Sequence, residues 1–240
     1  MIWVLFDIDG TLLQSHGLGR TAFNRAFEDV YSRPDALDGI ELAGATDRLV
    51  IRRILIELLG REFTPAEYDA LVTRFVARFV ERMNGVVWNL GGKPLPAYEA
   101  HEVPGAAALV RSLARRPDVR LGLATGNLRV TAELKLALIG VRDCFDYTLG
   151  GYGDRVETRE ALLEEALAAC AALPGPPPAR RIYFGDTVKD IRAAHAHGME
   201  VVGLRTHAEQ GSQLVAAGAH HAIDDFRDLP GILAFLGLDD

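Results

Sequence analysis

Short apolar segments alternate with longer amphipathic segments along most of the chain, and this alternation restricts the fold more than any other feature. The apolar segments, which we expect to be strands, cover residues 2–6, 120–124, 147–149, 181–184, 201–204 and 222–223. The amphipathic segments, which we expect to be helices, cover residues 105–115, 129–139, 159–172, 189–197, 212–217 and 230–236. Strands that are joined through helices run parallel, and helices then cover both faces of the sheet. The sequence therefore predicts an α/β fold built on a doubly wound parallel sheet.

The segment between residues 16 and 96 interrupts this alternation. Three stretches in it, residues 18–31, 47–60 and 66–83, repeat apolar residues with the spacing of amphipathic helices. Thr64 and Pro65 precede the third stretch as an N-cap and a first-turn proline. We therefore predict a helical domain over residues 16–96, inserted after the first strand into a core domain formed by residues 1–15 and 97–240.

The segment GGKPLPAYEAHEVPG, residues 91–105, returns the chain from the helical domain to the core. Gly91 and Gly92 can absorb large changes in backbone dihedral angles, while the prolines after them stiffen the chain. Two interpretations follow: a hinge that lets the helical domain close over the core, or an irregular surface loop.

Two aspartates, Asp7 and Asp9, come directly after the first expected strand. If this segment stays extended, both side chains point to the same side, because side-chain direction repeats every two residues. Two carboxylates so close repel each other, so that a proton or a cation has to lie between them. In open parallel sheets, ligands bind at the carboxyl ends of the strands, where both aspartates lie.

The strand at residues 120–124 also ends on polar groups. Thr125, Gly126 and Asn127 offer a hydroxyl, an unhindered backbone and an amide at the point where the next helix begins. Free N–H groups at a helix N-terminus form a natural phosphate site. An ordinary helix cap is the alternative interpretation.

Two further strand–helix junctions carry charged residues. Gly185 and Asp186 end one strand, and Asp190 follows one helical turn later. Arg159 lies in the first turn of another helix, where cations are disfavoured, which indicates a nearby anion. For Asp186 and Asp190 the alternative interpretation is a helix cap with a solvated face. For Arg159 it is an ordinary exposed arginine. A divalent cation with hard oxygen ligands would relieve the crowding of Asp7, Asp9 and Asp186.

These motifs resemble those of the haloacid dehalogenase-like hydrolase superfamily. DIDGT, from Asp7, is similar to its first motif, ATGN to its second, and GDTVKD to its fourth. The helical insertion is similar to the C1 cap of its phosphatase branch, as in phosphoglycolate phosphatases. The resemblance implies a Rossmann-type core and Mg²⁺-dependent hydrolysis of a small phosphorylated metabolite through an aspartyl-phosphate.

The resemblance also implies roles for individual residues. Asp7 would be the nucleophile, and Asp9 the general acid and base. Asp7, the backbone carbonyl of Asp9 and Asp186 would bind Mg²⁺, with Asp190 holding a metal-bound water. The phosphate would be held by Gly10, Thr11, Thr125, Gly126 and Asn127.

The third motif of the superfamily normally carries a lysine, and here the sequence departs from the pattern. Arg159 in TREALL is the favoured counterpart, and Lys135 is the other candidate. Lys135 would lie about two turns into its helix, roughly 10 Å along the axis, which argues against its reaching the site. Either cation would neutralise a phosphate, although arginine cannot give up its proton.

Other activities of the same fold remain as alternatives. A dehalogenase is disfavoured, because the resemblance implies that such enzymes lack the second acidic residue, which is Asp9 here. A phosphosugar mutase resembling β-phosphoglucomutase shares the cap type and both aspartates. A non-catalytic phospho-ligand-binding module would be expected to lack Asp7 or Asp9. Thr46 and Asp47 would either cap a helix of the insertion or face the substrate.

Charge and composition restrict the partners and the location. The net charge of −7 argues against a surface for nucleic acid or for an anionic membrane. Cys144 and Cys170 lack metal-ligand spacing and are interpreted as free thiols. The apolar start has no basic stretch before it and is too short for a signal peptide. We therefore expect a cytoplasmic monomer or homodimer.

Overall fold

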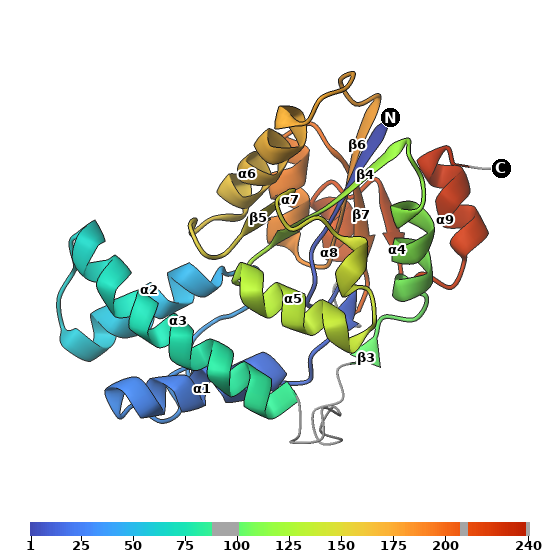
Figure 1. The fold of residues 1–240 in the computed structure, drawn as a ribbon. Helices are drawn as coiled ribbons and strands as arrows, with labels where there is room; N and C mark the ends of the chain where they lie inside the picture. The colour runs from blue at the N-terminus through green and yellow to red at the C-terminus, as the bar shows by residue number, and fades with distance from the viewer. Residues whose placement is uncertain (88–100, 207–210, 239–240) are drawn as a thin grey trace.

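The core of the molecule is a six-stranded parallel sheet (Figure 1). The computed structural model describes residues 1–87, 101–206 and 211–238. The strand order is β5-β4-β1-β6-β7-β8. These strands are β1 (Ile2–Phe6), β4 (Val119–Thr125), β5 (Gly150–Tyr152), β6 (Arg180–Gly185), β7 (Glu200–Leu204) and β8 (His221–Ile223). Phe6 pairs with Leu123 on one side and with Phe184 on the other, so the carboxyl ends of β1, β4 and β6 meet at one edge. The predicted doubly wound α/β fold is confirmed.

Alternating residues of β1 explain why helices cover both faces. Val4 and Phe6 belong to a core shared with α4 (Ala106–Ala114), α5 (Arg129–Leu138) and α9 (Leu229–Leu236). Trp3 and Leu5 belong to a second core, shared with α6 (Arg159–Ala172), α7 (Val188–Ala196) and α8 (Gly211–Ala216). Figure 1 shows α4 and α9 on one side of the sheet and α6 and α7 on the other. A strand buried on both faces needs a continuous apolar run, which β1 has.

The prediction of a strand at residues 147–149 is wrong. This segment is a turn after the short 3₁₀ helix Arg142–Cys144, and the strand β5 begins at Gly150. The Asp146 carboxylate accepts hydrogen bonds from the Thr148 N–H, at 2.9 Å, and from its hydroxyl, which holds the turn. Gly151 suits the strand because a Cβ there would overlap the backbone of Leu162 in α6. Close packing of the helix therefore outweighs the low strand propensity of glycine.

The insertion after β1 is helical, as predicted. It contains α1 (Leu18–Tyr31), α2 (Asp47–Leu59) and α3 (Pro65–Val87), which we call the cap. Its core is built around stacked and tilted rings of Phe23, Phe27, Phe75 and Phe79. The cap leaves the core after β2 (Leu13–Gln14), which pairs antiparallel with β3 (His101–Glu102). The expected hinge residues Gly91 and Gly92 lie outside the described residues, and the domain boundaries stay a prediction.

Among the helices that the structure describes, none combines the length and the apolar character needed to cross a membrane.

The N-terminus of α3 provides a test of local stability. The Thr64 hydroxyl accepts the Glu67 N–H at 3.3 Å, and Glu67 Oε2 accepts the Thr64 N–H at 2.9 Å, as in a capping box. We expect Thr64→Ala to lower the free energy of unfolding by about 1 kcal/mol, measured by urea denaturation. Thr73→Ala in the middle of the same helix is the control, and a loss as large as that of Thr64→Ala would contradict the interpretation.

The capping box also predicts that the stability of the protein depends on pH. The hydrogen bond from the Thr64 backbone, together with Arg61, lowers the pKa of Glu67 from 4.5 to about 2. The stabilisation by ionised Glu67 is therefore complete above pH 4.5 and is lost as the pH falls toward 2. The difference in stability between wild type and Thr64→Ala should shrink over that range.

Candidate active site

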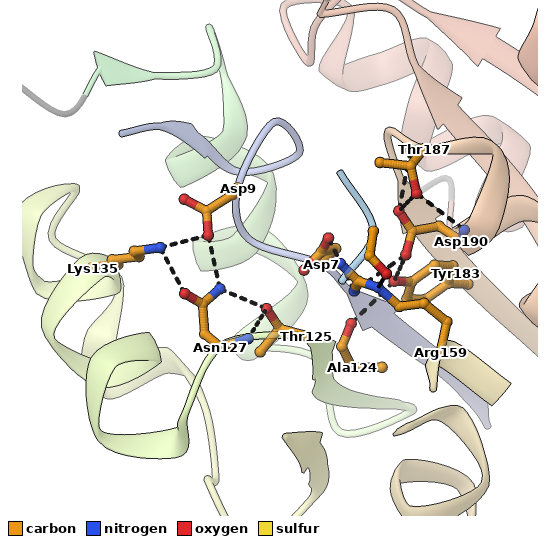
Figure 2. A network of polar contacts seen from close by, with 11 residues as sticks. Asp7, Asp9, Ala124, Thr125, Asn127, Lys135, Arg159, Tyr183, Thr187 and Asp190 are labelled. Atoms are coloured by element: carbon orange, nitrogen blue, oxygen red, sulfur yellow. Dashed lines mark hydrogen bonds and ion pairs between the residues drawn. The ribbon is translucent and has the colours of Figure 1, made fainter. Parts of the chain in front are cut away.

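Asp7 occupies the carboxyl end of the central strand. Its N–H donates to the Phe184 carbonyl at 2.9 Å, which continues the pairing of β1 with β6. The chain then turns, because the Ile8 carbonyl accepts N–H groups of Thr11, Leu12 and Leu13. The extended geometry assumed for the DIDGT segment therefore ends at Asp7. The side chains of Asp7 and Asp9 consequently bind different cations, as Figure 2 shows.

Asp7 shares the cation Arg159 with Asp190. Arg159 Nη1 lies 3.2 Å from Asp7 Oδ2 and 3.2 Å from Asp190 Oδ1, and all three residues are buried (Figure 2). Thr158 caps α6 by accepting the Ala161 N–H, which places Arg159 at the first helical position. Burial raises the pKa of Asp7 to about 6, although the charge of Arg159 opposes this. The arginine thus compensates only part of the cost of burying carboxylates here.

A third buried carboxylate, that of Asp186, lies beside this group. Single carboxylate oxygens of Asp7, Asp186 and Asp190 lie within 4.8 Å of one another. Burial, together with the charges of Asp190 and Asp7, raises the pKa of Asp186 well above its ordinary value. Gly10 makes this approach possible, because its φ is +75° and a Cβ there would overlap Asp186 Oδ2.

The donor set fits a divalent cation such as Mg²⁺. One oxygen of Asp7 and one of Asp186 are buried without a hydrogen-bond partner. Hard cations of this type prefer carboxylate oxygens. Asp190 is already held by Tyr183, Thr187 and Arg159, which leaves Asp7 and Asp186 as the freer ligands.

Asp9 belongs to a second network, built on Asn127. The Asn127 amide donates to Asp9 Oδ2 at 2.8 Å and to Thr125 Oγ1 at 2.8 Å. Lys135 Nζ lies 2.5 Å from Asp9 Oδ2 and 2.6 Å from Asn127 Oδ1 (Figure 2). The side chains of Thr125, Asn127, Asp9 and Lys135 therefore form one connected chain.

The objection that Lys135 lies too far from the site is wrong. Lys135 is the seventh residue of α5, roughly 9 Å along the axis from the first. Helical side chains point back toward the N-terminus, and the long lysine side chain covers this distance. Both candidates for the third motif thus reach the rim of the sheet, Arg159 beside Asp7 and Lys135 beside Asp9.

The charge of Lys135 controls the ionisation of Asp9. Burial alone would raise the pKa of Asp9, but the Lys135 ammonium and the Asn127 amide lower it below its ordinary value. When no ligand is bound, Asp9 is therefore a carboxylate, the form that accepts a proton.

The residues expected to hold phosphate lie around these two networks. The N–H groups of Gly10 and Thr11 are bonded within the turn, to the carbonyls of Leu13 and Ile8. The Thr11 hydroxyl is buried without a partner, and the Thr125 hydroxyl accepts from Asn127. Contact of these groups with phosphate stays a prediction.

A cavity of about 490 Å³ connects both networks with the cap. Asp7, Asp9 and Asp186 line its core side. The cap and its linker contribute Gln14, Ser15, His16, Arg20, Phe23, Leu37, Leu42, Ala45, Asp47, Val50 and Phe79, among others. The size is in the range of small-molecule sites.

Sequence reasoning missed two residues that support the acidic group. The Tyr183 hydroxyl lies 3.2 Å from Asp190 Oδ1 and 3.0 Å from the Ala124 carbonyl oxygen, and these two acceptors share its one proton. Thr187 caps α7 and donates its hydroxyl to Asp190 Oδ2. Thr187 could have been found from the Thr–x–x–Asp spacing of a capping box. Tyr183 carried no such signal, since it reads as an ordinary strand residue.

Known proteins are similar along nearly the whole chain. The family model of the haloacid dehalogenase-like hydrolases matches residues 3–198. A phosphoglycolate phosphatase of Cupriavidus necator is 30% identical over 96% of this chain and 92% of its own length. The protein CbbY of Rhodobacter capsulatus is 26% identical, with 89% of each chain covered.

Solved structures agree in fold. The structure of CbbY from Rhodobacter sphaeroides in complex with xylulose-1,5-bisphosphate has a TM-score of 0.66 to this chain at 23% identity. The alignment covers 99% of each chain. The first, second and fourth motifs meet at one edge of the sheet, under a helical cap. The chain belongs to the haloacid dehalogenase-like hydrolases, and it is similar to phosphatases of the branch with a helical cap.

Proposed function

We propose that the protein hydrolyses the phosphate monoester of a small metabolite through an aspartyl-phosphate, with Mg²⁺ as cofactor. The observation that carries this proposal is the free, buried oxygen of Asp7, which lies beside Arg159 and Asp186 on the wall of a cavity. A carboxylate in such a place can form a covalent intermediate.

Asp7 acts first as the nucleophile. Its carboxylate oxygen attacks the phosphorus, an O–P bond forms, and the bond from phosphorus to the leaving oxygen breaks. Arg159 neutralises charge on Asp7 and on the phosphoryl oxygens. Mg²⁺ held by Asp7 and Asp186 would supply further positive charge to the phosphoryl group.

Asp9 handles the protons in both halves of the reaction. It gives a proton to the leaving oxygen and then takes one from the water that hydrolyses the aspartyl-phosphate. Lys135 favours the ionised form that accepts this second proton. An arriving phosphate dianion has the opposite effect, because a like charge raises the pKa of a carboxylate. Asp9 then takes up a proton from solvent, and this is the proton that it gives to the leaving oxygen.

The cap side of the cavity points to a substrate with little charge beyond the reacting phosphate. Its described wall is mostly apolar, with Phe23, Val50 and Phe79 among the lining residues. The cation there, Arg20, is already bound to Asp38 and to the Leu37 carbonyl. We expect monophosphates to be better substrates than bisphosphates.

A phosphatase screen tests the proposal. Release of inorganic phosphate is measured for a panel of small phosphate esters that includes phosphoglycolate and pentulose bisphosphates. Each ester is tested first with Mg²⁺ and then with a chelator. We expect turnover of a monophosphate that the chelator abolishes and Mg²⁺ restores. Isomerisation of a sugar phosphate without net release would identify a mutase instead. Tight binding without any turnover would identify a non-catalytic module.

A further inference from the structure

The first residue of α2 connects the cap to the loop that follows β4. The Asp47 N–H donates to the Gly126 carbonyl at 2.7 Å, and Asp47 Oδ2 accepts the Leu128 N–H at 2.9 Å. One cap residue thus binds the backbone on both sides of Asn127. The loop at residues 126–128 carries the side chain on which the Asp9 network depends.

The surrounding backbone leaves little freedom for another arrangement. The Arg48 N–H donates to the Gly153 carbonyl, and the Gly153 N–H donates to the Asn127 carbonyl. A Cβ on Gly126 would overlap the Ala45 carbonyl oxygen. The start of α2 and the loop at residues 126–128 are therefore packed backbone to backbone.

Helix capping does not explain the position of the Asp47 carboxylate. Thr46 already fills the N-cap position of α2, where its hydroxyl accepts the Leu49 N–H at 3.2 Å. The Asp47 carboxylate is consequently free for the core, and it is half-buried at the edge of the cavity. Burial raises the pKa of Asp47 to about 6, and the Lys135 charge and the hydrogen bond from the Leu128 N–H offset only part of this cost.

We propose that Asp47 is a positioning residue, through which docking of the cap sets residues 126–128, and with them Asn127, in the arrangement required for hydrolysis. This proposal rests on the phosphatase function proposed above. The Asn127 amide orients Asp9, so a displaced loop would move the group that transfers protons. Proton transfer by Asp9 would then be efficient only with the cap in place, when the cavity is covered.

Kinetics of three variants test the proposal, with p-nitrophenyl phosphate as substrate at saturating Mg²⁺. Asp47→Ala removes the acceptor for the Leu128 N–H. A misplacement of about 1 Å costs up to about 100-fold in rate, so we expect kcat to fall at least about 10-fold. KM should change by less than about threefold, because Asp47 would act on the reacting geometry rather than on uniform binding. Asp47→Asn keeps an acceptor oxygen and should recover kcat to within about threefold of wild type.

Glu57→Ala is the matched control, since it removes an exposed carboxylate of the same helix that pairs with Arg33 in the cap. It should leave kcat unchanged. Wild-type kcat in folded Asp47→Ala would overturn the proposal, as would an Asp47→Asn variant as slow as Asp47→Ala. If Asp47→Ala does not fold, Asp47→Glu, which displaces the acceptor by one methylene, is measured in its place.

Hydrogen exchange gives a readout that does not depend on turnover. In the absence of substrate, a peptide that covers residues 126–132 should exchange faster in Asp47→Ala than in wild type or Asp47→Asn, because the Leu128 N–H has lost its acceptor. Unchanged exchange would overturn the proposal. Inactivity of the wild type toward all esters would instead refute the phosphatase function, and the exchange result would still decide the role of Asp47.

Discussion

Asp7→Asn is expected to lower turnover by about four orders of magnitude or more, since loss of a nucleophile typically has an effect of this size. The amide cannot attack phosphorus, and it also removes one oxygen ligand from the cation site formed with Asp186. The measurement is phosphate release in single-turnover and steady-state assays, with the best substrate of the screen and Mg²⁺ in excess.

The fold of Asp7→Asn should be unaffected, because asparagine has nearly the same shape. Burial raises the pKa of Asp7 to about 6, so above this pH the ionised side chain costs stability when no metal is bound. The metal-free melting temperature of Asp7→Asn above pH 6 should therefore equal or exceed that of wild type. Asp224→Asn, which changes an exposed carboxylate, is the control and should be fully active. Turnover by Asp7→Asn near the wild-type rate would refute the nucleophile assignment.

Arg159→Ala is expected to have the largest effect on stability. In the wild type the Arg159 side chain is 9% exposed, and its Nη1 lies 3.2 Å from carboxylate oxygens of both Asp7 and Asp190. Removing one partner of a buried ion pair typically costs about 3–5 kcal/mol, because a buried charge is left without compensation. We expect a loss of this size in metal-free protein, measured by chemical denaturation. Added Mg²⁺ should recover part of it, since the cation would bind the same carboxylates.

Activity measurements should separate the contribution of the Arg159 charge from that of its side-chain shape. Arg159→Lys keeps a cation at this position, and it should retain more activity than Arg159→Ala. Arg155→Ala, at an exposed neighbouring position, is the control for both measurements. Stability of Arg159→Ala equal to that of Arg155→Ala would contradict the proposed compensation of Asp7 and Asp190.

Much of the architecture was predictable from local patterns. The range of β1 and the start of α6 at Arg159 agree with the prediction, because a strand buried on both faces requires a continuous apolar run and a helix packed on a sheet requires apolar residues at helical spacing. The turn at residues 147–149 was not predictable in this way. There, the hydrogen bond from the Thr148 N–H to the Asp146 carboxylate and the packing of α6 on Gly151 outweighed local propensity.

The sequence by itself determined which chemical groups reach the carboxyl edge of the sheet. Asp7 and Asp186 each follow a strand and Thr125 ends one, and parallel strands bring such residues together wherever their helices pack. Only the tertiary structure decided which partner each group has. Lys135 meets Asp9 across 126 residues of sequence, and Asp47 meets Leu128 across 81. Both contacts depend on how α5 and the cap dock on the core, and periodicity within a helix carries no information about its docking.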